Sequence, residues 1–119
     1  MSTTAPSEGP PIDLNALRAM LGGDDGLVKM ILEKFRAEIS GDIEQLKSLQ
    51  SEQQAESIRA LAHRLKGTCG NAQAAKLSDI AKLLQFAVMA GELDRAPCLI
   101  KALDAARVSL ESYLVEQGY

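Results

Sequence analysis

Apolar residues recur every three or four positions over long segments of this chain, and this spacing constrains the fold more than any other feature. In an α-helix it places the apolar side chains along one stripe, whereas a half-buried strand needs strict alternation. The stripe expected between about residues 25 and 49 consists of Leu27, Ile31, Phe35, Ile39, Ile43 and Leu46, with Val28, Leu32 and Leu49 beside them. No segment alternates as a strand does, so the sequence predicts an all-α protein.

Four long helices and one short helix account for most of the chain. We expect them at about residues 13–21, 25–49, 51–73, 74–90 and 94–116. Long amphipathic helices with short connections fold most simply as an antiparallel up-down four-helix bundle, with the short N-terminal helix packed across one end. Residues 1–11 contain no apolar stripe and are predicted to be a disordered leader or linker. Residues 12–119 are then one helical-bundle domain.

Several helix ends have recognisable capping residues. Asp13 is suited to cap the first helix, because its carboxylate can accept a hydrogen bond from a free amide of the first turn. Ser51 and Gln54 form a capping-box pattern before the third helix. Asp94 is expected to cap the fifth helix. Gly41 weakens the second helix and would allow a bend there.

Charge and cysteine content exclude several classes of protein. The net charge of −3 argues against a nucleic-acid partner and against an anionic membrane surface. No run approaches the roughly 20 apolar residues of a membrane span, and the N-terminal residues do not resemble a secretory signal. Cys69 and Cys98 are expected to be buried free thiols in a reducing compartment. We therefore expect a monomeric cytoplasmic protein without a membrane partner.

His63 is the only histidine of the chain, and it lies away from the apolar stripe of its helix. At about 100° per residue, Leu61, Ala62 and Leu65 cluster around the direction of the core, whereas His63 points about 140° away from it. The same outer flank carries Glu56, Arg59, Lys66, Gly67 and Gly70. An exposed imidazole with this surrounding is a candidate reactive group.

The two glycines on this flank favour a functional role for His63. A glycine inside a helix costs about 0.5–1 kcal/mol relative to alanine. Gly67 and Gly70 point away from the core, so they would leave a path free of side chains for another macromolecule. Lys66, one turn after His63, can offset negative charge placed on the ring. A neutral imidazole is a nucleophile near neutral pH, and this combination suits reversible phosphorylation of His63.

The run from Ala62 to Asn71, AHRLKGTCGN, resembles the motif of the histidine-containing phosphotransfer (HPt) family, which reads approximately A-H-x-L-K-G-x-x-x-N. The resemblance extends over most of the chain, from about Ile12 to Leu114. The stretch LGGDDGLVKMILEKF is similar to the second helix of that family, and AGELD is similar to the turn between its last two helices.

The resemblance implies a phosphoryl carrier of bacterial two-component phosphorelays, either as a free-standing protein or as the HPt domain of a hybrid sensor kinase. The sequence has no glycine-rich phosphate loop or Walker-type segment, so no ATP site is expected. His63 matches the phosphorylated histidine, Lys66 the lysine that neutralises charge, and Gly67 the small residue that leaves room for the partner. Arg59 and Gly70 are further candidates for partner docking. The implied partners are receiver domains of response regulators and a hybrid sensor kinase. Their Mg²⁺ is held by the receiver, so no cofactor or metal is expected here.

The sequence departs from the family pattern at three places. Ala72-Gln73 replaces a Leu-Gly pair, Gln85 stands where glutamate is common, and Met89 stands where a basic residue is common. These changes concern the end of the third helix and the choice of partner.

Two other functions remain to be weighed against phosphotransfer. A non-catalytic helical module that docks a receiver or another partner would share the fold, but it would leave the exposed glycines and Lys66 without a purpose. A metal site would need ligands beside His63. Cys69 lies about 120° further around the helix, on the core side, and the chain has no second histidine.

Overall fold

The computed structural model describes residues 9–119, which form five α-helices, one 3₁₀ turn and no strand. The helices are α1 (Leu14–Met20), α2 (Asp25–Ser51), α3 (Ala55–Asn71), α4 (Ala75–Met89) and α5 (Ala96–Glu116), and the turn η2 (Leu93–Arg95) precedes α5. The prediction of an all-α protein is therefore confirmed. Residues 1–8 of the predicted leader lie outside the described part of the chain.

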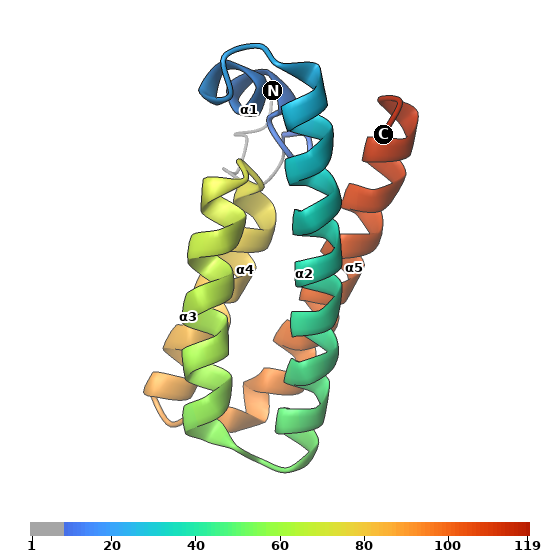
Figure 1. The fold of residues 1–119 in the computed structure, drawn as a ribbon. Helices are drawn as coiled ribbons and strands as arrows, with labels where there is room; N and C mark the ends of the chain where they lie inside the picture. The colour runs from blue at the N-terminus through green and yellow to red at the C-terminus, as the bar shows by residue number, and fades with distance from the viewer. Residues whose placement is uncertain (1–8) are drawn as a thin grey trace, which may run out of the picture.

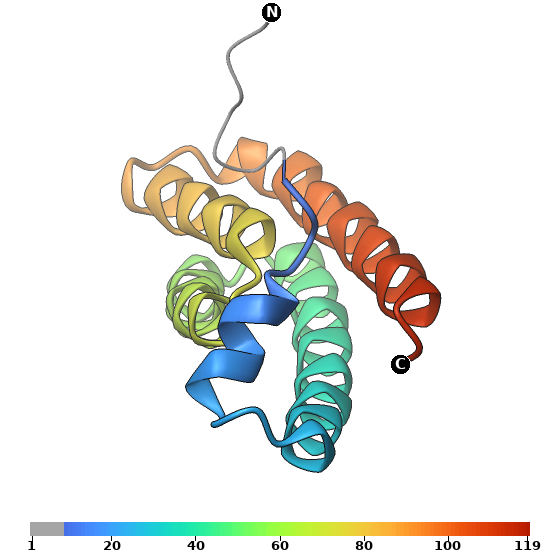
Figure 2. The ribbon, with the colours of Figure 1, turned by 90° about the horizontal axis from the view of Figure 1, so that it is seen from above.

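The four long helices pack as neighbours around a common core. α3 contacts α2 and α4, and α5 contacts α2 and α4, with the most extensive contact between α3 and α4. Successive long helices run in opposite directions (Figure 1). Seen from above, α1 crosses one end of this group (Figure 2). The main-chain amide of Asp13 donates to the Gln73 carbonyl oxygen at 2.9 Å, which ties the start of α1 to the turn between α3 and α4.

The core consists mainly of aliphatic side chains, and every helix contributes to it. Its fully buried members with the largest side chains are Ile12, Leu17, Leu32, Ile39, Ile43, Leu46, Ile58, Leu65, Leu77, Leu84, Leu103 and Leu110. Burial of this apolar surface provides the main driving force for folding. The predicted stripe of α2 is confirmed in its central part, whereas Leu27 and Ile31 near the start of the helix are only partly buried.

Of the three predicted helix caps, the one at Asp13 is confirmed, whereas the capping box at Ser51 and the cap at Asp94 are wrong. The Asp13 carboxylate accepts a hydrogen bond from the Ala16 amide at 3.0 Å, as expected of an N-cap. The predicted capping box does not form, because Ser51 is still part of α2 and Gln54 makes no side-chain cap bond to α3. The chain reverses at Gln53, whose φ is 55°, and the Gln54 amide donates to a carbonyl oxygen of α2 instead.

The start of α5 also differs from its prediction. Asp94 lies within η2 and caps nothing, because α5 begins at Ala96 and has no side-chain cap. Ala96 and Ile100 face the core, so Cys98, between them, points outward and is exposed. The expectation of a buried Cys98 is therefore wrong, whereas Cys69 is buried as predicted. Gly41 does not interrupt α2.

Candidate functional site

His63 lies on the exposed side of α3, as the helical periodicity predicts. The inward face of this helix is made of Ile58, Leu61, Ala62, Leu65 and Cys69, all of which are buried. These contacts fix the rotation of α3 about its axis and so aim His63 toward solvent. The imidazole is held by a rigid helix rather than by a loop, which positions it reproducibly for an incoming group.

Lys66 lies on the same face of α3, one turn beyond His63. Its side chain is partly buried, and its main-chain carbonyl oxygen accepts a hydrogen bond from the Ser78 hydroxyl at 2.8 Å. This bond fixes the register of α3 against α4 next to the candidate site. The sequence alone did not identify Ser78, because the contact depends on how two separate helices align.

Gly67 and Gly70 have different surroundings. A Cβ atom at Gly67 would meet nothing within 4 Å, so helix packing does not require a glycine there. A Cβ atom at Gly70 would lie 3.5 Å from Ser78 Oγ, which is an ordinary contact with α4. Both glycines are exposed. The free surface expected beside His63 is therefore most open at Gly67.

Arg59 does not present a free charge to the site. Its guanidinium forms a two-pronged ion pair with Glu56 one turn earlier on α3. The hydrogen bonds from Arg59 lower the pKa of the Glu56 carboxyl. As a docking residue, Arg59 would therefore meet a partner as part of a neutral pair.

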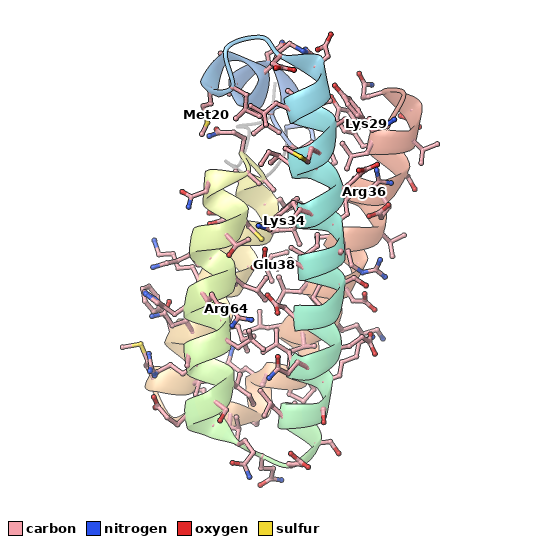
Figure 3. All side chains as sticks on the ribbon, in the orientation of Figure 1. Met20, Lys29, Lys34, Arg36, Glu38 and Arg64 are labelled. Atoms are coloured by element: carbon pink, nitrogen blue, oxygen red, sulfur yellow. The ribbon has the colours of Figure 1, made fainter. Side chains whose placement is uncertain are left out.

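A second ion pair attaches the opposite flank of α3 to α2. The side chain of Arg64, directly after His63, extends from α3 toward α2 (Figure 3). Its Nη2 donates to Asp42 Oδ1 at 2.8 Å. Asp42 is only 7% exposed, and its Oδ2 is buried without a hydrogen-bond partner among residues 9–119. Sequence reasoning missed this pair, although an acidic residue one turn after Ile39, inside the apolar stripe, was a usable signal.

α4 borders the other side of the site, and its outer surface carries two exposed apolar side chains. Phe86 and Met89 are 48% and 61% exposed. The Lys82 ammonium lies 5.7 Å from the centre of the Phe86 ring. Gln85 is buried, and its Oε1 has no hydrogen-bond partner in the described part of the chain. The two residues of α4 that depart from the family pattern therefore lie in different places. Gln85 lies in the interior, whereas Met89 lies on the surface.

The structure gives no support for a metal site. Residues 9–119 contain no group of three or more histidine, cysteine and carboxylate side chains placed to hold an ion. Burial raises the pKa of the Cys69 thiol to about 12, so this sulfur stays protonated at neutral pH. A metal would need the thiolate form.

Comparison with known proteins identifies the family. The model of the Hpt domain family matches residues 30–112, which is more than half of the chain. The chain belongs to the Hpt domain family. Its structure is similar to the crystal structure of histidine-containing phosphotransfer protein B (HptB) from Pseudomonas aeruginosa PAO1, with a TM-score of 0.80 and 26% sequence identity over 93% of this chain and 98% of that chain. No curated protein matches the chain in sequence.

As an Hpt domain, the chain functions in histidine phosphotransfer in phosphorelay signalling. Hpt domains carry phosphoryl groups between receiver domains and kinases, and they do not use ATP themselves. The described helices of this Hpt domain include none that is long and apolar enough to cross a membrane.

Proposed function

We propose that His63 is the phosphoacceptor of this Hpt domain. It would receive a phosphoryl group from the aspartyl phosphate of one receiver domain and pass it to the aspartate of another. One observation carries the proposal. The family's chemistry takes place on a histidine, and His63 is the only histidine in the chain, exposed on a rigid helix.

The transfer step requires little from the carrier beyond a nucleophile and a correct position. An imidazole nitrogen attacks the phosphorus in line with the aspartyl oxygen. The nitrogen–phosphorus bond forms while the phosphorus–oxygen bond breaks, and the aspartate leaves as a carboxylate with the electron pair. The other ring nitrogen keeps its proton. Passing the group onward is the reverse step on a second receiver.

Lys66 and Gly67 would support this step in different ways. The Lys66 ammonium, one turn from the ring, would offset the negative charge of the phosphoryl oxygens. Gly67 would let the receiver's backbone and phosphorylated aspartate approach the ring, because it presents no side chain and its surroundings are open. The surface around Arg59 and Gly70 would contact the receiver outside the reacting centre.

The Mg²⁺ needed for transfer would be held by the receiver, so this chain would need no cofactor. The opposite directions of successive long helices support an up-down four-helix bundle, with α1 as the extra helix. We propose that the domain works as a cytoplasmic monomer, a state that size-exclusion chromatography with light scattering would test.

Intact-mass analysis after incubation with phosphoramidate tests the role of His63. The wild-type chain should gain one phosphoryl group that mild acid removes, since phosphohistidine is acid-labile. The His63→Gln variant should gain none while keeping the helical circular dichroism and melting temperature of the wild type. A folded wild-type chain that gains no phosphoryl group would instead favour a module that only docks its partner.

A further inference from the structure

Lys82 lies on the flank of α4 that faces α3. Ser78, four residues earlier, marks this flank, because its hydroxyl contacts the Lys66 carbonyl oxygen at 2.8 Å. Residues four apart lie on the same face of a helix, so Lys82 continues this line along the contact between α3 and α4. Lys82 is exposed. Its ammonium is therefore available at the outer edge of the contact.

The antiparallel arrangement of α3 and α4 places Lys82 at about the same level along the helix pair as His63. The two helices pack against each other and run in opposite directions (Figure 1). One turn toward the end of α4 therefore corresponds to one turn toward the start of α3. Counting one turn from the Ser78–Lys66 contact reaches Lys82 on α4 and approximately His63 on α3.

Lys82 and Lys66 differ from the other cations around His63. Arg59 and Arg64 are each paired with a carboxylate of the same or a neighbouring helix. Neither Lys66 nor Lys82 has an ion pair within residues 9–119. Two positive charges without ion-pair partners in the described residues thus lie within about one helical turn of the level of His63, one on each helix.

The Phe86 ring keeps the Lys82 ammonium close to the protein surface. The ammonium lies 5.7 Å from the ring centre, within the range of a cation–π contact. At an exposed site such a contact is weak. A doubly charged phosphoryl group is a stronger partner, so the ammonium can move from the ring to that group.

We propose that Lys82 is a second cation for the phosphoryl group carried on His63, acting together with Lys66. This inference rests on the proposed function. A protein-bound phosphoryl group carries about −1.5 to −2 charges near neutral pH. During transfer that charge is spread over three oxygens. Ammonium groups from α3 and α4 approach these oxygens from different sides and neutralise more charge than Lys66 alone. No bond to either lysine forms or breaks.

The rate of labelling by phosphoramidate tests this role without a protein partner. Lys82→Gln should slow the formation of phosphorylated His63 about fivefold to tenfold, a moderate loss because the site is exposed. Lys82→Arg should retain most of the rate. The matched control is Lys76→Gln, which removes an exposed lysine from another face of α4. Circular dichroism should show the same melting temperature for all variants.

The salt dependence separates an electrostatic role of Lys82 from a structural one. Because salt screens exposed charges, raising the ionic strength should narrow the difference in labelling rate between wild type and Lys82→Gln. Equal labelling rates for Lys82→Gln and Lys76→Gln, beside a wild type that is labelled at His63, would overturn this inference and leave the proposed function intact. A wild-type chain that is not labelled at all would overturn the proposed function itself.

Discussion

Arg64 Nη2 donates to Asp42 Oδ1 at 2.8 Å, so the residue next to the candidate phosphoacceptor anchors α3 to α2. On the opposite flank, the Ser78 hydroxyl bonds to the Lys66 carbonyl oxygen and anchors α3 to α4. The segment of α3 that carries His63 is therefore held from both sides by polar contacts. The buried core beneath it sets its distance from the other helices.

Breaking the Asp42–Arg64 pair should destabilise the fold. Arg64→Leu would leave the buried Asp42 carboxylate without a hydrogen-bond donor, and we expect a loss of about 1–2 kcal/mol in the free energy of unfolding, moderated by the exposed position of Arg64. The double variant Asp42→Leu/Arg64→Leu should recover most of this loss, because it buries no unpaired charge. Urea unfolding measures the free energy of unfolding of the single and the double variant. A stability of Arg64→Leu equal to wild type would show that the pair contributes nothing.

Gly67→Ala should stabilise the protein while it impairs transfer. A Cβ atom there meets nothing within 4 Å, so the better helix propensity of alanine should raise the free energy of unfolding by about 0.5–1 kcal/mol. Transfer from a phosphorylated receiver domain should become slower, and Gly67→Leu should nearly abolish it. Labelling of both variants by the small donor phosphoramidate should change much less, because no protein surface has to dock.

Gly41 provides the matched control for this prediction. It also lies inside a helix with nothing within 4 Å of an added Cβ atom, but on α2. Gly41→Ala should raise stability by a similar amount and leave receiver-dependent transfer unchanged. If Gly67→Leu transferred at the wild-type rate, the idea of an approach path at Gly67 would be wrong.

The Arg36–Glu111 pair should make stability depend on acidic pH. Arg36 donates to both Glu111 carboxylate oxygens, and these hydrogen bonds lower the pKa of the Glu111 carboxyl despite an opposing effect of burial. A lowered pKa in the folded state contributes stability above the unfolded value of about 4.3, and this stability is lost as the pH falls through the folded value.

Glu111→Gln tests this dependence. With the Glu111 side chain one-third exposed, we expect a cost of at most about 1 kcal/mol at pH 7. The cost should vanish as the pH falls through the lowered pKa of Glu111 in the folded state, where the wild-type carboxyl is also protonated. Urea unfolding across this range measures the difference between the two chains. A difference that stays constant with pH would show that the ionised form of Glu111 adds no stability.

The two cysteines should differ in reactivity. Cys98 is exposed, whereas Cys69 is buried and the pKa of its thiol is raised to about 12. Iodoacetamide at neutral pH should therefore add one group to the folded chain, at Cys98, and two after unfolding in urea. Folded Cys98→Ser should remain unmodified. Rapid modification of that variant would mean that the core around Cys69 opens readily.

Local patterns in the sequence predicted the helices, the Asp13 cap and the outward direction of His63, because each depends on residues within a few positions of one another. The sequence did not predict the contacts of Asp42 with Arg64 or of Ser78 with Lys66. Both depend on the register between helices, which helical periodicity does not specify. The prediction of a capping box at Ser51 was wrong because α2 continues through that residue. The backbone amides of the following turn donate instead to carbonyl oxygens near the end of α2.

The support of α3 from both flanks has a consequence for how a signal is carried. A helix held in this way has no evident second arrangement, so the arrival of a phosphoryl group should alter the local charge and leave the backbone where it was. Information would then reside in the occupancy of one imidazole nitrogen rather than in a change of shape. Each partner would read it by the same surface contact, which suits a carrier that must serve donor and acceptor alike.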